Sequence, residues 1–237
     1  MKQLLICIAF HYNKIQLQYL IKVLDNFFDN YNIEFDIIID SNKSVIPELS
    51  GYDVEIIAHP NQAHPFHLTW QHRKHVFDNI DNYENFMYVE DDMLIPFENY
   101  LNYLENFKLL FPKYVPSFIR IENYEGVDYI TDVTKIQSLL PINTKGKQFA
   151  KLNEPYHAFW IMPQKELKET MISNFVRLSD SRETASTYIM WELRKTGLVE
   201  IENNQISSKC YSYHLSNNYA RSKESIFAKI EPNKIFK

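Results

Sequence analysis

The segment Phe86-Met87-Tyr88-Val89-Glu90-Asp91-Asp92 gives the clearest indication of the fold class. Its first four residues predict a short strand that is buried on both faces, and three acids follow at the carboxyl end of that strand. Earlier apolar runs have the same character, and they lie at 4–10, 35–39 and 54–58. Helical patterns separate these strands, so we expect an α/β fold with a mainly parallel central sheet and helices on both faces.

Residues 113–219 have a less regular pattern. Segments 117–121 and 127–130 predict strands of a small antiparallel ribbon, and a further strand is expected over 156–162. A helix predicted over 179–197 would end at Gly197, because glycine is common just beyond the last helical turn.

A single domain is expected over 1–219, since neither an internal repeat nor a low-complexity linker divides the chain of 237 residues. We divide it into a nucleotide-binding half, 1–112, and an acceptor-side half, 113–219. A basic C-terminal tail, 220–237, follows this domain. The tail is either a solvated end or a segment that docks on a surface.

Composition excludes several classes of protein. A net charge of −5 argues against a general nucleic-acid binder, and no stretch approaches the ~20 apolar residues of a membrane span. Cys7 and Cys210 lie too far apart in sequence to suggest a zinc site or a disulfide framework, so we expect a reducing, cytoplasmic location. With only 4 glycines, all widely separated, the chain has neither a G-x-G-x-x-G nor a Walker phosphate loop.

Polar residues follow each predicted strand at its carboxyl end. They are His11, Asp40, His59 and the acids at 90–92. Ligands of parallel α/β sheets bind outside the carboxyl ends of the strands, so these side chains mark the expected site.

The acids Glu90, Asp91 and Asp92 are the strongest local signal. Three adjacent carboxylates repel one another, and hard oxygen ligands of this kind suit Mg²⁺ or Mn²⁺. Strand alternation would place Glu90 and Asp92 on one side and Asp91 on the other. The alternative is a solvated acidic turn at the start of the next helix.

In their order along the chain, five segments resemble the A-type glycosyltransferases that use nucleotide-sugar donors. Residues 6–11 resemble the first strand of that family, and 37–41 resemble the second, where an acid often contacts the base. The acids at 90–92 resemble the D-x-D element. Residues 183–197 are similar to the acid-led helix of the family, and 213–215 to its late histidine.

The resemblance spans about residues 4 to 219 and differs from the commoner family pattern in two places. E-D-D replaces D-x-D at 90–92, which leaves open which acid binds the metal. The aromatic segment 156–160 replaces a glycine-rich acceptor segment, which leaves the acceptor open.

This resemblance implies transfer of a sugar from a nucleotide-diphosphate donor, with UDP as the expected nucleotide, to a hydroxyl acceptor. The acceptor would be a glycan or a lipid-linked saccharide, and Mn²⁺ or Mg²⁺ would assist. Asp92 and His214 would bind the metal, while Glu90 or Asp91 would act through water or hold the ribose. His11 and Asp40 would contact the nucleotide.

Arg73 and two acids complete the candidate set. Arg73 is expected on an apolar helical face within 65–80, from which it could reach the diphosphate or the sugar; the alternative is an arginine that extends to a surface carboxylate. Glu183 is a candidate general base, with Asp180 as the second candidate, and a base is required only if the reaction inverts the anomeric carbon. Alternatively, Asp180 and Glu183 form a capping box.

Two other functions remain open on the sequence. One is a metal-dependent phosphoesterase that uses the same acids and the histidine-rich segment 59–75, in which His72 and His75 are helical neighbours. That segment holds neither an H-E-x-x-H motif nor a cysteine, which argues against a zinc site. The other is a non-catalytic module that binds a sugar or a nucleotide.

Overall fold

The first apolar run forms the central strand of a five-stranded sheet. β1 (Lys2–Phe10) pairs in parallel with β2 (Phe35–Ser41) on one side and with β4 (Tyr83–Glu90) on the other. β3 (Glu55–Ala58) pairs in parallel with β2, and β11 (Phe159–Pro163) adds an antiparallel strand beside β4. The order is therefore β11-β4-β1-β2-β3, and the sheet is mainly parallel, as predicted.

The computed structural model describes residues 1–131, 133, 140–151, 158–188, 192–222 and 229–236. Contacts divide the chain into two units. The first comprises 1–92 and 158–188, and the second comprises 93–157 and 189–237. The five-stranded sheet belongs to the first unit.

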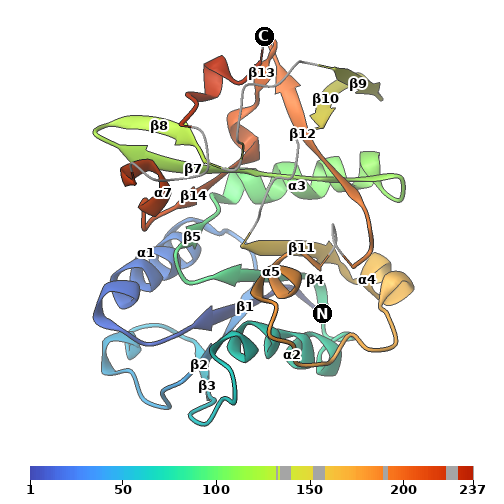
Figure 1. The fold of residues 1–237 in the computed structure, drawn as a ribbon. Coiled ribbons are helices and arrows are strands. Elements are labelled where there is room, and N and C mark those ends of the chain that lie inside the picture. Colours follow the sequence, from blue (N-terminus) through green and yellow to red (C-terminus); the bar gives the residue numbers. More distant parts are fainter. Residues whose placement is uncertain (132, 134–139, 152–157, 189–191, 223–228, 237) are drawn as a thin grey trace. The chain divides into compact units, whose positions relative to one another are not determined.

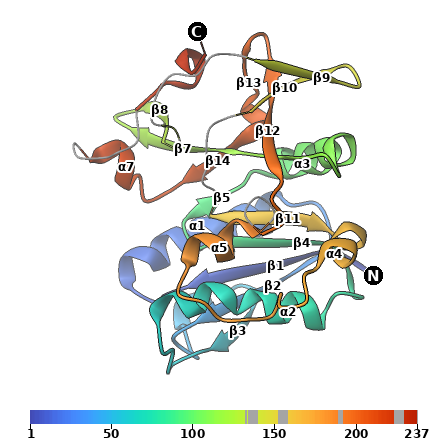
Figure 2. The same cartoon turned by 45° about the vertical axis from the view of Figure 1, so that its right-hand side comes forward.

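Helices cover both faces of this sheet, as the sequence predicts. α1 (Lys14–Asn30) connects β1 to β2, whereas α2 (His72–Asp78) lies on the return path from β3 to β4. The two crossovers run in opposite directions across the sheet, and right-handed connections then place α1 and α2 on opposite faces (Figures 1 and 2). β1 is consequently buried from its third residue on.

Shorter elements complete the first unit. These are the 3₁₀ turns η1 (Pro47–Leu49) and η2 (Pro65–Trp70), and the helices α4 (Gln164–Thr170) and α5 (Arg182–Ser186). α4 contacts β4 and β11, and α5 contacts η2 and β4.

Two small sheets and one long helix form the second unit. The predicted ribbon is confirmed, because β7 (Ile119–Tyr124) pairs antiparallel with β8 (Val127–Ile130). β14 (Tyr211–His214) pairs in parallel with β7 and antiparallel with β5 (Met93–Leu94). The helix is α3 (Phe97–Leu110). The other sheet contains β6 (Tyr114–Pro116), β9 (Pro141–Thr144), β10 (Lys147–Lys151), β12 (Thr196–Glu202) and β13 (Gln205–Ile206).

The prediction of one continuous helix over 65–80 is wrong. Residues of η2 follow a 3₁₀ path, which has three residues per turn, before α2 begins. The expected apolar face therefore does not form: Trp70 and Arg73 are buried, whereas Phe66 and Phe77 are exposed.

The helix predicted to end at Gly197 is also wrong. α5 ends at Ser186, and Gly197 lies in β12, opposite Val115 of β6. Strand pairing on both sides of β12 outweighs the local helical pattern, as tertiary context often does. The strand predicted over 156–162 is β11, and residues 156 and 157 lie outside the described residues.

The described part of the C-terminal segment packs into the second unit. α7 (Asn218–Arg221) contacts β7, Ile230 forms a bridge with Ile130, and Ile235 beside η4 (Pro232–Lys234) is buried. The predicted division into 1–112, 113–219 and a tail over 220–237 stays a prediction.

Cys7 and Cys210 are both free and buried. None of the helices among the described residues has the length and apolar character needed to cross a membrane.

His72 lies in the core of the first unit as a neutral imidazole. Its ring stacks on Tyr88, Trp160 Nε1 donates to its Nε2 at 3.0 Å, and its Nδ1 donates to the Thr69 carbonyl at 2.7 Å. Because an indole N–H can only donate, Nε2 must carry the lone pair. Burial, and then the charge of Arg73, hold the pKa of His72 well below its ordinary value.

We expect the free energy of unfolding to fall as the pH drops below about 6.5, because the unfolded chain then binds a proton that the folded ring does not accept. The stability that His72 contributes is fully present above that pH and is lost as the pH falls toward the lowered pKa of the folded ring. Between the two pKa values, the free energy of unfolding changes by at most ~1.4 kcal/mol per pH unit. Urea unfolding of the parent and of His72→Gln, measured across this range, should show the smaller slope in the variant. His67→Gln, on the same segment, is the matched control and should keep the parent slope. Equal slopes in the parent and His72→Gln would contradict the assignment.

Candidate functional site

The parallel register gathers polar residues at one edge of the first unit's sheet. Ala9 of β1 is in register with Asp40 of β2 on one side and with Glu90 of β4 on the other. The loops that follow β1 and β2 are joined by Asn42, whose Oδ1 accepts from the Tyr12 N–H at 2.7 Å. His11 Nε2 lies 3.5 Å from Asn42 Nδ2. Asp40, Glu90 and the His11 loop therefore share the carboxyl edge of the sheet.

The three acids that end β4 are all buried, with exposed fractions of 9% for Glu90 and 7% for Asp91 and Asp92. Glu90 Oε1 accepts from the Ser186 hydroxyl of α5 at 3.1 Å and lies 3.6 Å from Arg182 Nε. Glu90 thus faces α5, on one side of the sheet.

Asp91 faces the other side of the sheet. Its Oδ1 accepts from Gln16 Nε2 of α1 at 3.2 Å, so Glu90, at the end of β4, and Asp91, in the turn that follows, contact different helices. Burial, and then the neighbouring charges of Asp92 and Glu90, raise the pKa of Asp91 well above its ordinary value. The ionised form of Asp91 is therefore disfavoured in this environment.

This triplet fits a divalent cation on charge and on chemistry. The side chain of Arg182, the cation beside Glu90, is 40% exposed, so solvent screens its charge and it offsets only a fraction of the negative charge. Carboxylate oxygens are the ligands that Mg²⁺ and Mn²⁺ prefer. Glu90, Asp91 and Asp92 offer oxygen donors of this kind, although Glu90 and Asp91 face different helices and the three acids do not converge on one point in this conformation.

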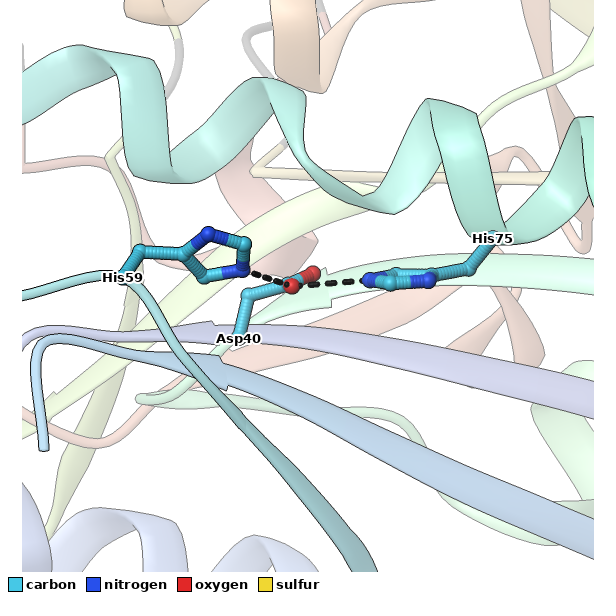
Figure 3. A group of neighbouring side chains, drawn as sticks. All are labelled: Asp40, His59 and His75. Atoms are coloured by element: carbon cyan, nitrogen blue, oxygen red, sulfur yellow. Dashed lines mark hydrogen bonds and ion pairs between the residues drawn. The ribbon is translucent and has the colours of Figure 1, made fainter. Parts of the chain in front are cut away.

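A second cluster surrounds Asp40 (Figure 3). His59, which follows β3, and His75 of α2 both direct Nε2 at Asp40 Oδ1, at 2.7 and 2.8 Å. The His59 N–H donates to the Ser41 carbonyl at 2.7 Å, which continues the pairing of β2 with β3. The three side chains could jointly hold a metal ion, because their ligand atoms lie within 4.8 Å of one another. His72, which the sequence places beside His75, contacts Trp160 and Thr69 instead.

Arg73 is fully buried among aromatic rings. Its guanidinium lies 4.2 Å from the Trp70 ring centroid and also contacts the rings of Phe175 and Tyr188. It donates to the Phe175 carbonyl at 3.4 Å and to the Thr184 carbonyl at 3.2 Å. These contacts join α2 to the segment that leads into α5. The diphosphate contact expected for Arg73 stays a prediction.

The two candidate bases lie at the start of α5. Asp180 is 72% exposed, and its Oδ1 lies 2.9 Å from His67 Nε2. The Trp70 indole N–H donates to the Ser181 carbonyl at 3.1 Å, and the Thr184 N–H donates to the Ser181 hydroxyl at 3.2 Å. The Ser181 hydroxyl thus accepts a backbone N–H at the start of the helix. On the sequence, the alternative to a catalytic role for Asp180 and Glu183 is a capping box at this helix start. The side chain of Glu183 lies outside the described residues.

His214 belongs to the second unit, at the end of β14. Its Nδ1 forms a short contact with Oε1 of the fully buried Glu122, and its Nε2 lies 2.8 Å from the Ser216 hydroxyl. The other Glu122 oxygen accepts from the Ala220 N–H of α7. A histidine that donates one ring nitrogen to a carboxylate presents the other as a lone pair, which is the usual arrangement of a metal-ligating histidine.

Several polar partners escaped the sequence analysis: Glu122, Ser186, Arg182 and Gln16. Glu122 lies 92 positions from His214, so only the pairing of β7 with β14 brings the two together. Gln16 lies in the first turn of α1, and its side chain contacts Asp91. The local signal that could have indicated Glu122 is its position in 119–122, where charged residues alternate with isoleucines along a strand.

Solved structures resemble this chain at low sequence identity, whereas no family model and no curated protein matches it. S. aureus TarS 1-349 matches with 12% identity over 92% of this chain and 62% of its own, with a TM-score of 0.49. GalNAc-T7, solved with UDP, GalNAc and Mn²⁺, matches with 10% identity over 90% of this chain and 43% of its own, with a TM-score of 0.53. The fold is GT-A-like. The family resemblance inferred from the sequence is thereby confirmed at the level of the fold, and the chain spans less than two thirds of either structure.

Replacing Asp91 by Asn should stabilise the metal-free protein at neutral pH. The raised pKa means that the folded chain holds a proton on Asp91 more tightly than the unfolded chain does, so ionisation above the unfolded value of about 3.9 destabilises the fold. Asparagine keeps an acceptor for Gln16 and removes the charge.

We expect a higher Tm for Asp91→Asn near pH 7.5, by a few degrees, since 1 kcal/mol corresponds to about 2–4 °C in a chain of this size. The difference should shrink as the pH falls toward about 4. Scanning calorimetry in the presence of a chelator measures it. Asp29→Asn, at an exposed acid of α1, is the control and should change little. A Tm below that of the parent at neutral pH would refute the prediction.

Proposed function

We propose that this chain is a glycosyltransferase, which moves a sugar from a nucleotide-diphosphate donor to a hydroxyl acceptor with a divalent metal. The observation that carries the proposal is the buried triplet Glu90, Asp91 and Asp92 at the carboxyl edge of a GT-A-like sheet. Burying adjacent carboxylates is unfavourable unless a cation compensates their charge. The triplet is therefore supported as a metal and diphosphate site rather than a solvated turn.

Asp92 and His214 are the proposed metal ligands. β5 begins at Met93, directly after Asp92, and Met93 is in register with His214 within the second unit. Glu122 would keep His214 in the tautomer whose Nε2 carries a lone pair, and the Ser216 hydroxyl, 2.8 Å from Nε2, would give way to the metal. An imidazole beside carboxylates favours Mn²⁺ over Mg²⁺, because Mg²⁺ is bound almost entirely through oxygen.

The metal would stabilise the negative charge that builds up on the leaving diphosphate. Glu90 and Asp91 would then act through water or hold the ribose, and α5 would orient Glu90 through Ser186. His11 is proposed beside the nucleotide, at the edge that it shares with Asp40. We take UDP as the nucleotide, in keeping with the family resemblance. GalNAc-T7, of related fold, was solved with UDP and Mn²⁺.

The acceptor would be a glycan or a lipid-linked saccharide, deprotonated by Asp180 or Glu183 if the reaction inverts. Asp180 is well exposed, as a base that meets an incoming hydroxyl must be, and His67 is positioned to orient it.

A thermal-shift measurement tests the donor and the metal together. A UDP-sugar at a hundredfold excess over Kd should stabilise the protein by ~2.7 kcal/mol when Mn²⁺ is present. Asp92→Asn should lose the part of this shift that depends on Mn²⁺. If no nucleotide-sugar stabilises the parent with Mn²⁺ present, the proposed function is wrong. If only the Asp92→Asn shift is unchanged, the ligand assignment is wrong.

Slow hydrolysis of the donor separates the three classes of function. A transferase should release UDP from a UDP-sugar with Mn²⁺. A phosphoesterase should cleave simpler phosphoesters, and a binding module should cleave neither.

Glu122→Gln should weaken Mn²⁺ binding by about 10- to 100-fold, the effect typical of losing the carboxylate behind a ligating histidine. Glutamine retains an oxygen that can accept from Ala220, so the local fold has a substitute partner. Titration of Mn²⁺ followed by electron paramagnetic resonance measures the affinity. Glu200→Gln is the matched control, because Glu200 is a buried acid of the same unit that contacts Asn106 and Lys147. An unchanged affinity in Glu122→Gln would remove Glu122 from the metal site.

A further inference from the structure

We propose that Asp40, His59 and His75 form a second metal site, distinct in chemistry from the acids at 90–92 and suited to a borderline transition cation such as Zn²⁺. The site lies entirely within the first unit, where Figure 3 shows both imidazoles directed at one carboxylate. It does not depend on the proposed function.

The three ligand atoms lie near enough to one another to bind one ion, since all of them fall within 4.8 Å. Asp40 Oδ1 lies 2.7 Å from His59 Nε2 and 2.8 Å from His75 Nε2. Around a tetrahedral ion with bonds of about 2.0–2.1 Å, ligand atoms are separated by about 3.3 Å. To admit the ion, each imidazole nitrogen would move about half an ångström away from Oδ1, and the two nitrogens, which lie within 4.8 Å of each other, would also settle at about 3.3 Å.

The burial of the cluster points to a bound cation. The Asp40 side chain is 1% exposed, and the side chains of His59 and His75 are 18% and 13% exposed. Asp40 Oδ2 is buried, and the described residues provide it with no hydrogen-bond partner. Both imidazoles contact Oδ1, whereas Oδ2 is buried without a hydrogen bond, which is unusual for a buried carboxylate oxygen. A metal ion bound to the carboxylate would compensate its charge.

The donor set selects the metal. Two imidazole nitrogens and one carboxylate oxygen suit Zn²⁺ and its first-row neighbours, whereas Mg²⁺ and Ca²⁺ require oxygen ligands. Three protein ligands leave a fourth position for water or another small ligand, as in catalytic zinc sites. With one carboxylate and two neutral imidazoles, a divalent ion leaves the site with one positive charge, which favours an anion at that position.

The ligands are also held on rigid elements. Asp40 is paired within β2, His59 is fixed by its own N–H bond to Ser41, and His75 projects from α2. Such placement preorganises the three donor atoms. The assignment gives the Asp40 carboxylate a metal ion in place of the nucleobase contact expected from the sequence.

Cobalt substitution tests the site. Metal-depleted protein titrated with Co²⁺ should show the intense visible absorption of a tetrahedral complex with one equivalent, and Zn²⁺ should abolish this absorption by displacement. His75→Gln should lose the absorption and bind Zn²⁺ more than about 100-fold less tightly, beyond the 10- to 100-fold effect of losing an outer hydrogen-bond partner.

Glutamine is chosen because its amide can still donate to Asp40, so a purely hydrogen-bonding role for the histidine would survive the change. His59→Gln, at the end of a strand, is the second variant in case His75→Gln does not fold, which circular dichroism reports. His67→Gln and Asp92→Asn are the controls, and both should keep the absorption. Absence of the tetrahedral absorption in the parent, or its persistence in both His59→Gln and His75→Gln, would overturn the proposal.

Discussion

Repulsion among three buried carboxylates is the constraint on which the candidate site depends. The backbone of Glu90 is held at the edge of the sheet from both sides. Ala9 of β1 pairs with Glu90 on one side, and the N–H of Glu90 donates to the Ala158 carbonyl on the other. Ser186 and Gln16 donate neutral hydrogen bonds to Glu90 and Asp91, and the partly exposed Arg182 lies 3.6 Å from Glu90. The sheet therefore fixes negative charge where water is scarce, so that binding a cation and stabilising the fold become linked.

Arg73 places a buried positive charge in the same unit. Its buried charge is stabilised by the faces of aromatic rings and by two backbone carbonyls, a combination that is effective where water is excluded. One of these carbonyls belongs to Thr184, within α5, the helix that also carries the Glu90 partner Ser186. Arg73 can therefore influence the acids through the position of α5, without contacting a substrate.

The features that depend on local sequence pattern could be predicted from the sequence. The strands around Ala9 are continuous apolar runs, and their parallel order follows from the helices between them, so the edge with Asp40 and Glu90 could be foreseen. The helix to Gly197 could not be predicted correctly, because the pairing of β12 with β6 and β10 overrides local propensity. The cluster around Asp40 could not be foreseen for a similar reason. Sequence motifs compare spacings, whereas His59 and His75 meet at Asp40, 19 and 35 positions earlier, through strand register and a crossover helix.

The first turn after β1 differs from the phosphate-binding turn of many α/β folds. In α/β folds this turn often holds a phosphate on free backbone N–H groups at the start of the helix. Here the N–H groups of Ile15 and Gln16 donate to the Asn13 side chain, and the turn itself contains no glycine. Gly126 and Gly146 lie at positive φ in hairpin turns of the second unit, so they serve the backbone there. A diphosphate at this edge would therefore find the α1 N-terminus already satisfied, and its charge would have to be met by a cation that the acids of β4 hold.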